Sequence, residues 1–400
     1  MNKPKIRFKG FEGEWKKVKI GDVAPLTGGF AFQSGQFKTS GVPIIRISNI
    51  LSSGIVGGDF VYYNEFKGDS EFRLYKGDVV IAMSGATTGK VATFEANDFG
   101  YQNQRVGKFS RTNLVNYELL SKLVSAPNFQ KKIISKLTSS AQPNASSKDI
   151  DSIDLVVPEE TEEQRALASY FTSLDAQIAA STSRLSSLKQ IKAASLLNMF
   201  PQKGETVPRV RFKGFQGEWV RQRLGDISAS FSGGTPAVSV SDYYGGNIPF
   251  IRSGEIHENR TQLYITQAGL NNSSAKIVEK GTILYALYGA TSGDVGISKL
   301  RGAINQAILA IEPTKDIDNF FLAGFLQSYK NRIINELLQG GQGNLSGSLV
   351  KKILLAIPSL SEQRAIASYF TALDAQITLH RERLEKLKQI KAACLEKVFA

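Results

Sequence analysis

EQRALASYFTSLDAQI, at residues 163–178, returns as EQRAIASYFTALDAQI at residues 362–377. The likeness extends over 38 positions in each copy, of which 25 are identical. In both copies the same positions recur at alternating steps of four and three, the a/d spacing of helices that pack along one another. Two long helices, at residues 159–200 and 359–400, packed against each other are therefore predicted. A helix of 38 residues is about 57 Å long at about 1.5 Å per residue.

Most positions of the predicted seam are apolar, but each copy also carries polar ones that weaken a strict zipper. Ile191 and Ile390 lie beside the seam and are expected to widen the apolar stripe. The single cysteine, Cys394, lies on this face and is interpreted as a small core residue. The seam positions are Leu174, Ile178, Ser181, Leu185, Leu188, Lys192, Ser195 and Met199, and Leu373, Ile377, His380, Leu384, Leu387, Lys391, Cys394 and Val398.

The start of each long helix carries a recognisable signal. Thr161 with Gln164, and Ser359 with Glu362, have the spacing of a capping box. Glu163 and Glu362 also suit the positive end of a helix dipole. The arginines that follow are candidate contacts for a partner protein, and they are Arg165 and Arg364.

A second segment is also duplicated, because RFKGFEGEWKKVKIGD at residues 7–22 returns as RFKGFQGEWVRQRLGD at residues 211–226, with 10 of 16 positions identical. Its aromatic side chains are expected to pack this segment against the base of the helices, with base stacking as the alternative. These are Phe8, Phe11, Trp15, Phe212, Phe215 and Trp219. Between the duplicated segments the halves diverge, which predicts one domain at residues 1–158 and another at 209–358, with a linker at 201–208.

Within each half, short β-branched runs between glycines predict strands. One amphipathic helix is expected late in each half, near residues 116–137 and 318–338, before a polar loop. The predicted fold class is therefore α+β: two mixed α/β domains, an internal pseudo-twofold repeat, and no Rossmann unit. The strand-like runs lie at residues 42–50, 77–85 and 153–158, and at residues 248–256, 281–289, 305–313 and 352–358.

Composition indicates the kind of partner. The 400 residues carry a formal net charge of +13 and a pI near 9.5, which favours a polyanionic ligand over a merely basic solvated surface. One cysteine excludes an intramolecular disulfide and fits a reducing compartment. The N-terminus lacks a signal-peptide apolar run, and no apolar stretch approaches the roughly 18–20 residues that span a membrane. A cytoplasmic location is therefore expected.

Motifs of catalysis are not found. SGATTGKV at residues 84–91 departs from the phosphate-loop pattern, and the second half has Asp294 at the lysine position, so a tight turn with glycines at positive φ is favoured. His257 and His380 have no cysteine or carboxylate at metal-ligand spacing. The chain is interpreted as a binding protein without an active site, a metal or a cofactor.

The chain resembles the specificity (S) subunit of a Type I restriction-modification system. The resemblance lies in the opening GEW-x(5)-GD, a variable region ending in a strand and proline, and the EQRAxASYFTxLDAQI…LKQIKAA helix, all present twice. It implies two target recognition domains, each reading one half of a bipartite, asymmetric site in double-stranded DNA, held apart by antiparallel helices. It also implies that catalysis belongs to separate chains: two adenine-N6 methyltransferase subunits that use S-adenosylmethionine, and ATP-dependent translocase-nuclease subunits. The alternatives are a free-standing two-headed DNA-binding regulator and a coiled-coil adaptor that binds protein only.

The duplication also serves as an internal control for DNA contacts, because features shared by divergent heads serve the frame or the phosphates, whereas differing features specify sequence. Asparagine and glutamine can pair with adenine, yet the recurrence of an Asn-Gln pair argues for a structural hydrogen bond. The shared candidates are Arg46 and Arg252, Thr87 and Thr291, Asn103 and Gln104, and Asn305 and Gln306. The differing candidates are Ser48, Asn49, Ser84, Lys90 and Arg105 in the first head, and Glu255 and Tyr288 in the second. The loop candidates are Gln142, Asn144, Lys148, Gln342 and Asn344.

Overall fold

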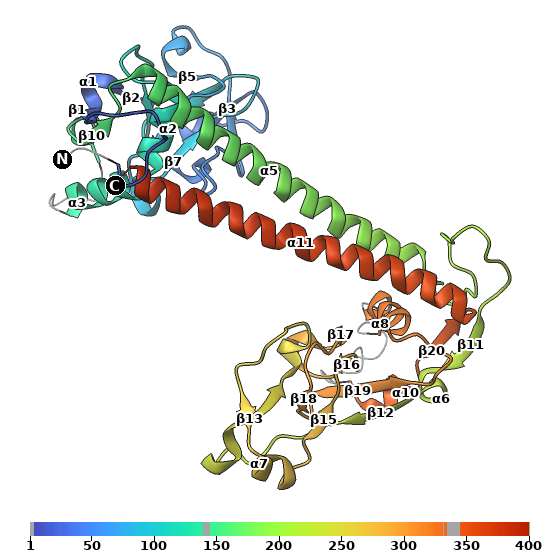
Figure 1. The fold of residues 1–400 in the computed structure, drawn as a ribbon. Coiled ribbons are helices and arrows are strands. Elements are labelled where there is room, and N and C mark those ends of the chain that lie inside the picture. The colour runs from blue at the N-terminus through green and yellow to red at the C-terminus, as the bar shows by residue number, and fades with distance from the viewer. Residues whose placement is uncertain (1–3, 139–144, 331, 334–344, 400) are drawn as a thin grey trace. The chain divides into compact units, whose positions relative to one another are not determined.

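The computed structural model describes residues 4–138, 145–330, 332–333 and 345–399, and the chain forms two compact units. The first unit comprises Met1–Thr182 and Glu382–Ala400, and the second comprises Ser183–Arg381. Two long helices, α5 (Thr161–Asn198) and α11 (Leu360–Val398), pass from one unit into the other (Figure 1). Each unit therefore contains one mixed domain, which we call a head, together with the beginning of one long helix and the end of the other.

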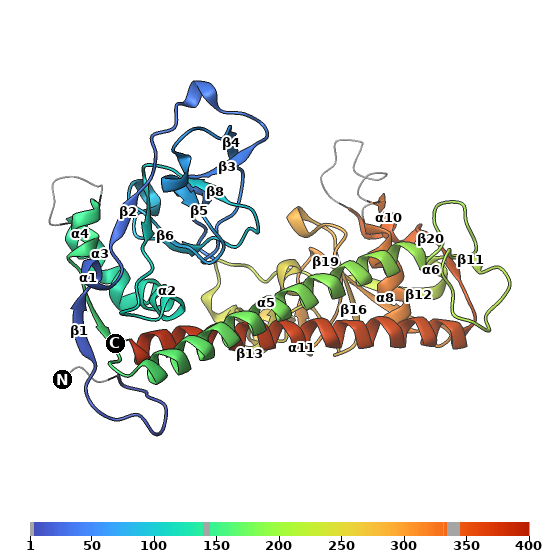
Figure 2. The ribbon, with the colours of Figure 1, turned by 90° about the horizontal axis from the view of Figure 1, so that it is seen from above.

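The first head is built from three sheets and a few short helices (Figure 2). Its strands are β1 (Lys16–Lys19), β2 (Leu26–Gly28), β3 (Val42–Ile45), β4 (Val61–Tyr63), β5 (Arg73–Leu74), β6 (Val79–Ala82), β7 (Val91–Thr93), β8 (Gly100–Gln102), β9 (Val106–Phe109) and β10 (Asp154–Val157). Its helices are α1 (Ile20–Val23), α2 (Tyr117–Ser125), α3 (Pro127–Thr138) and α4 (Ser147–Asp151), with short 3-10 turns that include η2 (Ile47–Asn49) and η4 (Gly85–Thr87).

The second head repeats this order. Its strands are β11 (Val220–Arg223), β12 (Ser228–Ser232), β13 (Tyr244–Ile251), β14 (Tyr264–Ile265), β15 (Lys276–Val278), β16 (Ile283–Ala286), β17 (Val295–Ile297), β18 (Gly302–Ile304), β19 (Ile308–Pro313) and β20 (Leu354–Ile357). Its helices are α6 (Leu224–Ile227), α7 (Gln267–Asn271), α8 (Asn319–Ser328) and α10 (Gly347–Lys351), with turns that include η6 (Ser253–Glu255) and η7 (Gly289–Thr291).

The two heads share one sheet topology despite their divergent sequences. One sheet has the order β2-β9-β6-β7 in the first head and β12-β19-β16-β17 in the second, and every pairing in it is antiparallel. Another has the order β4-β3-β8-β5 or β14-β13-β18-β15, with one parallel pair, β3 with β8 or β13 with β18. A two-stranded ribbon, β1-β10 or β11-β20, completes each head. The prediction of two mixed α/β domains is confirmed.

Strand β6 shows why its residues are apolar on both faces. Successive side chains of a strand point to opposite sides. Val80 and Ala82 join a core with residues of the other sheet, such as Ile45 and Leu74. Val79 and Ile81 join the core that contains α2, α3 and α5. The sheet is thus covered on both faces, and β16 is placed the same way between two cores of the second head.

The long helices pack along the predicted seam within each unit. In the first unit Leu174 of α5 shares a core with Leu387 of α11. In the second unit Leu188 of α5 packs with Leu373 and Ile377 of α11, so the helices run antiparallel. The polar seam positions Lys192 and Ser195 are paired across the helices, because Lys192 binds Asp374 at 2.6 Å and the hydroxyls of Ser195 and Tyr369 lie 2.9 Å apart. The Nδ1 of His380, another seam position, is enclosed without a partner among the described residues. Cys394 is half-buried against the first core, as expected of a small core residue.

The expectation that two isoleucines widen the seam is wrong. Ile191 is 45% exposed and Ile390 is 37% exposed. Each lies three residues after a buried seam leucine, Leu188 or Leu387. A pair of helices covers only the narrow a/d stripe, so the flanking position stays open.

Four of the six duplicated aromatic residues form aromatic contacts, three of them with residues in or directly after a long helix and one, that of Trp219, with α8. Trp15 is buried and lies 6.2 Å, between ring centroids, from Phe399. Phe8 contacts Tyr170 edge-on. In the second unit Trp219 packs against Phe321, and Phe212 against Tyr369.

The helix starts use other contacts than a capping box. Ser359 Oγ does accept the Glu362 N–H at 3.4 Å, but the Glu362 carboxylate binds Arg211 and not the cap backbone. Thr161 is already the first residue of α5, and Gln164 Oε1 accepts the Asn116 N–H instead. The two predicted capping boxes are therefore wrong, because these side chains are used to hold the head.

A clasp of one ion pair and one glutamine fastens each head to its helix. We call these six residues the clasp, and they are Arg7, Glu163 and Gln164 in the first unit and Arg211, Glu362 and Gln363 in the second. Arg7 binds Glu163 with two contacts of 2.7 Å, and Arg211 binds Glu362 with two contacts of 2.7 Å. Both carboxylates are almost fully buried, and the hydrogen bonds that they accept raise the pKa of each arginine. Each glutamine donates to a proline carbonyl and accepts from a helix start, and these are Gln164 with Pro158 and Asn116, and Gln363 with Pro358 and Asp318.

The late amphipathic helix is also interrupted. The helix predicted near residues 116–137 is two helices, α2 and α3, with Pro127 as the first residue of the second. Proline is tolerated at the first turn of a helix but not in its interior. In the second head α8 ends at Ser328, and the predicted helix beyond residue 333 lies outside the described residues. Among the described helices, none is long and apolar enough to cross a membrane.

The ion pairs of Asp175 in α5 are expected to stabilise the first unit near neutral pH and to lose this effect in acid. It binds Lys122 at 2.7 Å and Lys391 at 2.5 Å. Burial alone would raise its pKa, but the two ammonium groups together hold the pKa below its usual value. A lowered folded-state pKa stabilises the fold above the unfolded-state pKa, and this contribution is lost as the pH falls through the folded-state pKa. We therefore expect the difference in unfolding free energy between wild type and Asp175→Asn to shrink on titration from about pH 6 to about pH 2, as measured by urea denaturation. A difference that stays constant or grows on acidification would contradict this.

Candidate nucleic-acid interface

Three short segments meet at one end of the sheets in each head. In the first head the N–H of Asn103 donates to Ile45 O at 3.2 Å, which joins the turn after β8 to the end of β3. The N–H of Met83 donates to Arg105 O at 2.9 Å, which joins the same turn to the end of β6. The second head repeats the latter bond between Leu287 N and Ala307 O at 2.8 Å. We call this region the turn edge, residues 46–49, 84–90 and 103–105, and residues 252–255, 288–294 and 305–307.

The Gly-Ala-Thr segments of the turn edge are tight turns, as favoured by the sequence. Gly85 and Gly89 have φ of 72° and 85°, and Gly289 and Gly293 have φ of 75° and 80°. Side chains with a Cβ rarely adopt this left-handed region. Glycine is therefore required there for the backbone, whether or not a ligand binds.

The recurring asparagines have a structural role. Asn103 Oδ1 accepts the Arg105 N–H at 3.3 Å, and Asn305 Oδ1 accepts the Ala307 N–H at 3.2 Å. These are local side-chain to backbone bonds of the kind that stabilise turns. The glutamines that follow, Gln104 and Gln306, are exposed. The recurrence of asparagine is thus explained by the turn, and the glutamines remain candidates for contacts with DNA.

Asn49 and Glu255 differ in type, but their side chains form the same hydrogen bond to the backbone. Asn49 Oδ1 accepts the Arg46 N–H at 3.0 Å, and Glu255 Oε2 accepts the Arg252 N–H at 3.2 Å. Asn49 is fully buried, and its Nδ2 donates to the carbonyls of Gly57 and Asp59. These bonds argue against a base contact by Asn49, because its polar atoms are already engaged.

The remaining candidates differ in how open they are. Ser48 and Tyr288 are exposed, whereas Ser84, the counterpart of Tyr288, is buried. Thr87 and Thr291 are half-buried. Thr291 Oγ1 donates to Tyr288 O at 3.5 Å, and Thr87 Oγ1 is enclosed with no partner among the described residues.

The basic candidates lie mainly in the first head. Arg105 is exposed, and Lys90 is half-buried. Lys148 is exposed on α4, three residues after Ala145, whose N–H donates to Met83 O at 2.9 Å. The remaining loop candidates lie outside the described residues, and they are Gln142, Asn144, Gln342 and Asn344.

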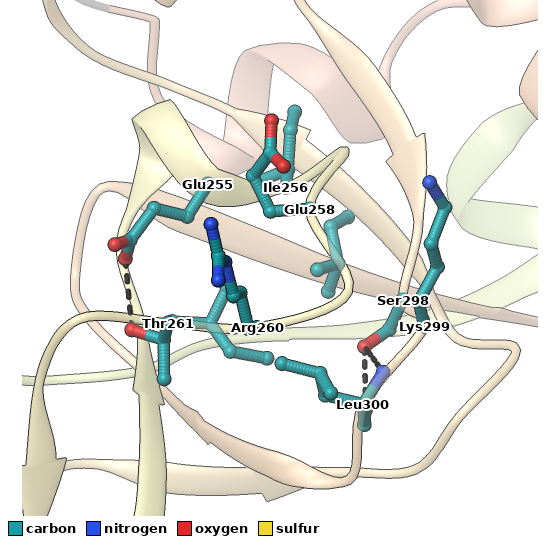
Figure 3. Close-up of a pocket in the computed structure, with 10 residues that line it drawn as sticks. Glu255, Ile256, Glu258, Arg260, Thr261, Ser298, Lys299 and Leu300 are labelled. Atoms are coloured by element: carbon teal, nitrogen blue, oxygen red, sulfur yellow. Dashed lines mark hydrogen bonds between the residues drawn. The ribbon is translucent and has the colours of Figure 1, made fainter. Parts of the chain in front are cut away.

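A shallow surface depression adjoins the turn edge of the second head (Figure 3). Figure 3 shows Glu255 bonded to Thr261, at 3.1 Å, with Arg260 beside them. Sequence reasoning did not single out Arg260, Thr261 or Lys299. The available signal was the polar run HENRTQ at residues 257–262, directly after a strand-like segment. No group of three or more metal-ligating side chains occurs in the part of the chain that the structure describes.

Two heads of one topology, each with its own turn edge and each fastened to a shared pair of helices, define a two-headed binding protein. The chain matches the family model described as the Type I restriction modification DNA specificity domain over residues 12–190 and 216–389. The chain belongs to this family.

Individual relatives resemble the whole chain. The putative type I restriction enzyme MjaX specificity subunit of Methanocaldococcus jannaschii is 24% identical over 396 residues, which cover 94% of this chain and 91% of that protein. The type I restriction enzyme EcoBI specificity subunit of Escherichia coli is 23% identical over 413 residues, with 94% and 84% covered. The S subunit structure of a Type I restriction-modification system from M. genitalium has a TM-score of 0.68 at 16% identity, covering 100% of this chain and 99% of that one. This last likeness concerns the fold.

Proposed function

We propose that this chain is the DNA-recognition subunit of a Type I restriction-modification complex, in which each head reads one half of a bipartite, asymmetric site. The single observation that carries the proposal is the pair of turn edges, which share a backbone but differ in side chains. Equivalent backbones place both heads on DNA in the same manner, and different side chains read different bases. The half-sites should therefore differ in sequence.

The proposal divides the chain into a first target recognition domain at residues 1–158 and a second at 209–358. The helices at residues 159–200 and 359–400 separate the domains and offer a dock for partners. Arg165 and Arg364 occupy equivalent exposed positions near the helix starts. The partners are proposed to be two adenine-N6 methyltransferase subunits and ATP-dependent translocase subunits, which would supply the chemistry. A free-standing regulator is not favoured, because the relatives are named specificity subunits.

Exchange of one head tests the proposal. Residues 30–158 are replaced with the equivalent head of a relative, and methylated sites are mapped genome-wide by sequencing. We expect one half-site to change and the other to stay, because each head is a separate domain with its own cores. The reciprocal exchange of residues 234–358 is the matched control and should change the other half-site. A change in both half-sites from one exchange would refute the division of reading between the heads.

A further inference from the structure

Arg46 and Arg252 occupy the same place in the two heads but differ in what surrounds their guanidinium groups. Each follows a strand, β3 or β13, and precedes a turn, η2 or η6. Each donates its backbone N–H to the side chain three residues later, as described above. The difference is that this side chain is a neutral amide in the first head and a carboxylate in the second.

In the second head the carboxylate neutralises the arginine. Arg252 Nη2 donates to Glu255 Oε1 at 3.1 Å, and Arg252 Nε donates to Glu255 Oε2 at 3.3 Å. The carboxylate is held in place from the other side as well, because it also accepts bonds from Thr261 Oγ1 and the Gln262 N–H. The pair is therefore a fixed, net-neutral unit.

In the first head no carboxylate of the described residues balances the positive charge of Arg46. Arg46 Nη2 donates to the carbonyl of Asp59 at 3.3 Å. Within the described residues, no carboxylate lies at ion-pair distance from Arg46, which is half-buried, and its Nε is enclosed without a hydrogen-bond partner. Asn49 cannot be its counter-ion, because an amide carries no charge and its Nδ2 already serves two carbonyls.

Neighbouring positions of the turn edge differ in the same direction. Lys90 has Asp294 as its counterpart, and Asp294 is bound to Lys330. Arg105 has the uncharged Ala307 as its counterpart. The first turn edge thus presents cations at three positions where the second presents a neutralised arginine, a paired carboxylate and an alanine.

We propose that Arg46 binds a phosphate of the DNA backbone and that Arg252, held by Glu255, does not. The inference rests on the proposed DNA-binding function and deepens it, because it assigns to the first head an ionic contact that the second head lacks at the same place. A guanidinium group can hold a phosphate through two parallel hydrogen bonds. For Arg252 the same contact would require it to leave Glu255, whose carboxylate would then face the phosphate and repel it.

The number of ionic contacts can be counted from the salt dependence of binding. The probe is a 40-base-pair duplex of random sequence, because phosphate contacts do not depend on base sequence. The full-length chain is used, together with any subunits that purify with it, and Kd is measured by fluorescence anisotropy at several salt concentrations. Each neutralised phosphate contributes about −0.9 to the slope of log K against log salt. The wild type should give a steep negative slope.

Four variants distinguish the two arginines. Arg46→Gln should make the slope shallower by about 0.9, and Arg46→Lys should keep it. Glu255→Gln should make the slope steeper by about 0.9. The isosteric amide still accepts the Arg252 N–H, but it no longer balances the positive charge of the guanidinium group, which is then available to a phosphate. The double variant Arg252→Gln/Glu255→Gln removes the neutral pair and should restore the wild-type slope. Arg260 is unchanged in all variants, so any contact that it makes is common to them.

The outcomes separate this inference from the proposed function. A flat slope for the wild type would overturn both. A steep wild-type slope that Arg46→Gln leaves unchanged would overturn the phosphate contact alone. If Glu255→Gln leaves the slope unchanged, Glu255 does not keep Arg252 from the phosphates. If the slope of the double variant becomes as shallow as that of Arg46→Gln, Arg252 already contacts a phosphate in the wild type. Either result would overturn the proposed difference between the heads. Thermal denaturation of each variant accompanies the measurement, and Glu255→Gln tests the second head independently of any effect on the first.

Discussion

Arg211→Ala should destabilise the second unit by about 3–5 kcal/mol, because it leaves the buried carboxylate of Glu362 without its counter-ion. Arg211 supplies both short contacts to that carboxylate and also donates to the carbonyls of Gln216 and Gly217. Removing one partner of a buried pair costs more than removing both. We therefore expect Glu362→Gln in the Arg211→Ala background to recover part of the loss.

The chain allows each unit to be monitored separately. It contains two tryptophans, Trp15 in the first unit and Trp219 in the second, and both are buried. With Trp15→Phe as background, the fluorescence of Trp219 reports urea unfolding of the second unit. Arg7→Ala, followed by Trp15 in a Trp219→Phe background, is the twin experiment for the first unit.

A matched control is available at the surface. Arg165 binds Glu162 at 2.6 Å, but both side chains are largely exposed. Arg165→Ala should therefore change stability by no more than about 0.5 kcal/mol. Equal effects of Arg165→Ala and Arg7→Ala in the first unit would mean that burial of the clasp has no energetic role.

Lengthening both long helices by one heptad should move the two half-sites apart by about three base pairs. Seven added residues lengthen a helix by about 10 Å, at about 1.5 Å per residue, and rotate it by only about 20°. DNA rises about 3.4 Å per base pair. The insertion belongs after Thr182 in α5 and after Arg381 in α11, where the chain passes between the units. The a/d pattern is then kept in both helices, and we expect the same half-sites with a longer unspecified spacer.

Methylation sequencing of the double insertion provides the measurement. The control is the same heptad in α5 alone, which would shift the seam against α11 and separate pairs such as Lys192 with Asp374. Insertion near Leu197 is unsuitable, because Met199 and Phe200 belong to the core of the second unit. Methylation at the original spacing by the double insertion would mean that the helices do not set the distance.

Much of the fold is predictable because its signals are local or repeated. The a/d steps that contain Leu188 and Leu373 predict long packed helices from spacing alone. The duplication predicts two similar domains, and the short glycine-bounded runs predict strands. Glycines at residues 85 and 289 predict tight turns, since few other residues adopt positive φ. The recurrence of Asn103 as Asn305 correctly indicated a structural hydrogen bond.

Other features depend on partners that are distant in sequence. Arg7 and Glu163 are separated by 156 positions, so no local pattern links them. The glutamic acid therefore suggested a helix dipole, and Gln164 suggested a cap. Ile191 looked like part of the apolar stripe, and only the position of the facing helix decides which flank is covered.

The turn edge shows most clearly which features can be predicted from the sequence and which require the tertiary structure. From the sequence, a change from Asn49 to Glu255 resembled a change of base reader, because the two residues differ in charge and occupy equivalent places. The tertiary structure shows both bound to the backbone of the preceding arginine, and thus shows that the substitution alters the charge of that arginine's surroundings. The sequence by itself determined the duplication, the helices and the two heads, because these follow from periodicity. Only the tertiary structure decided which polar atoms are already satisfied, because hydrogen bonds depend on three-dimensional distance and direction.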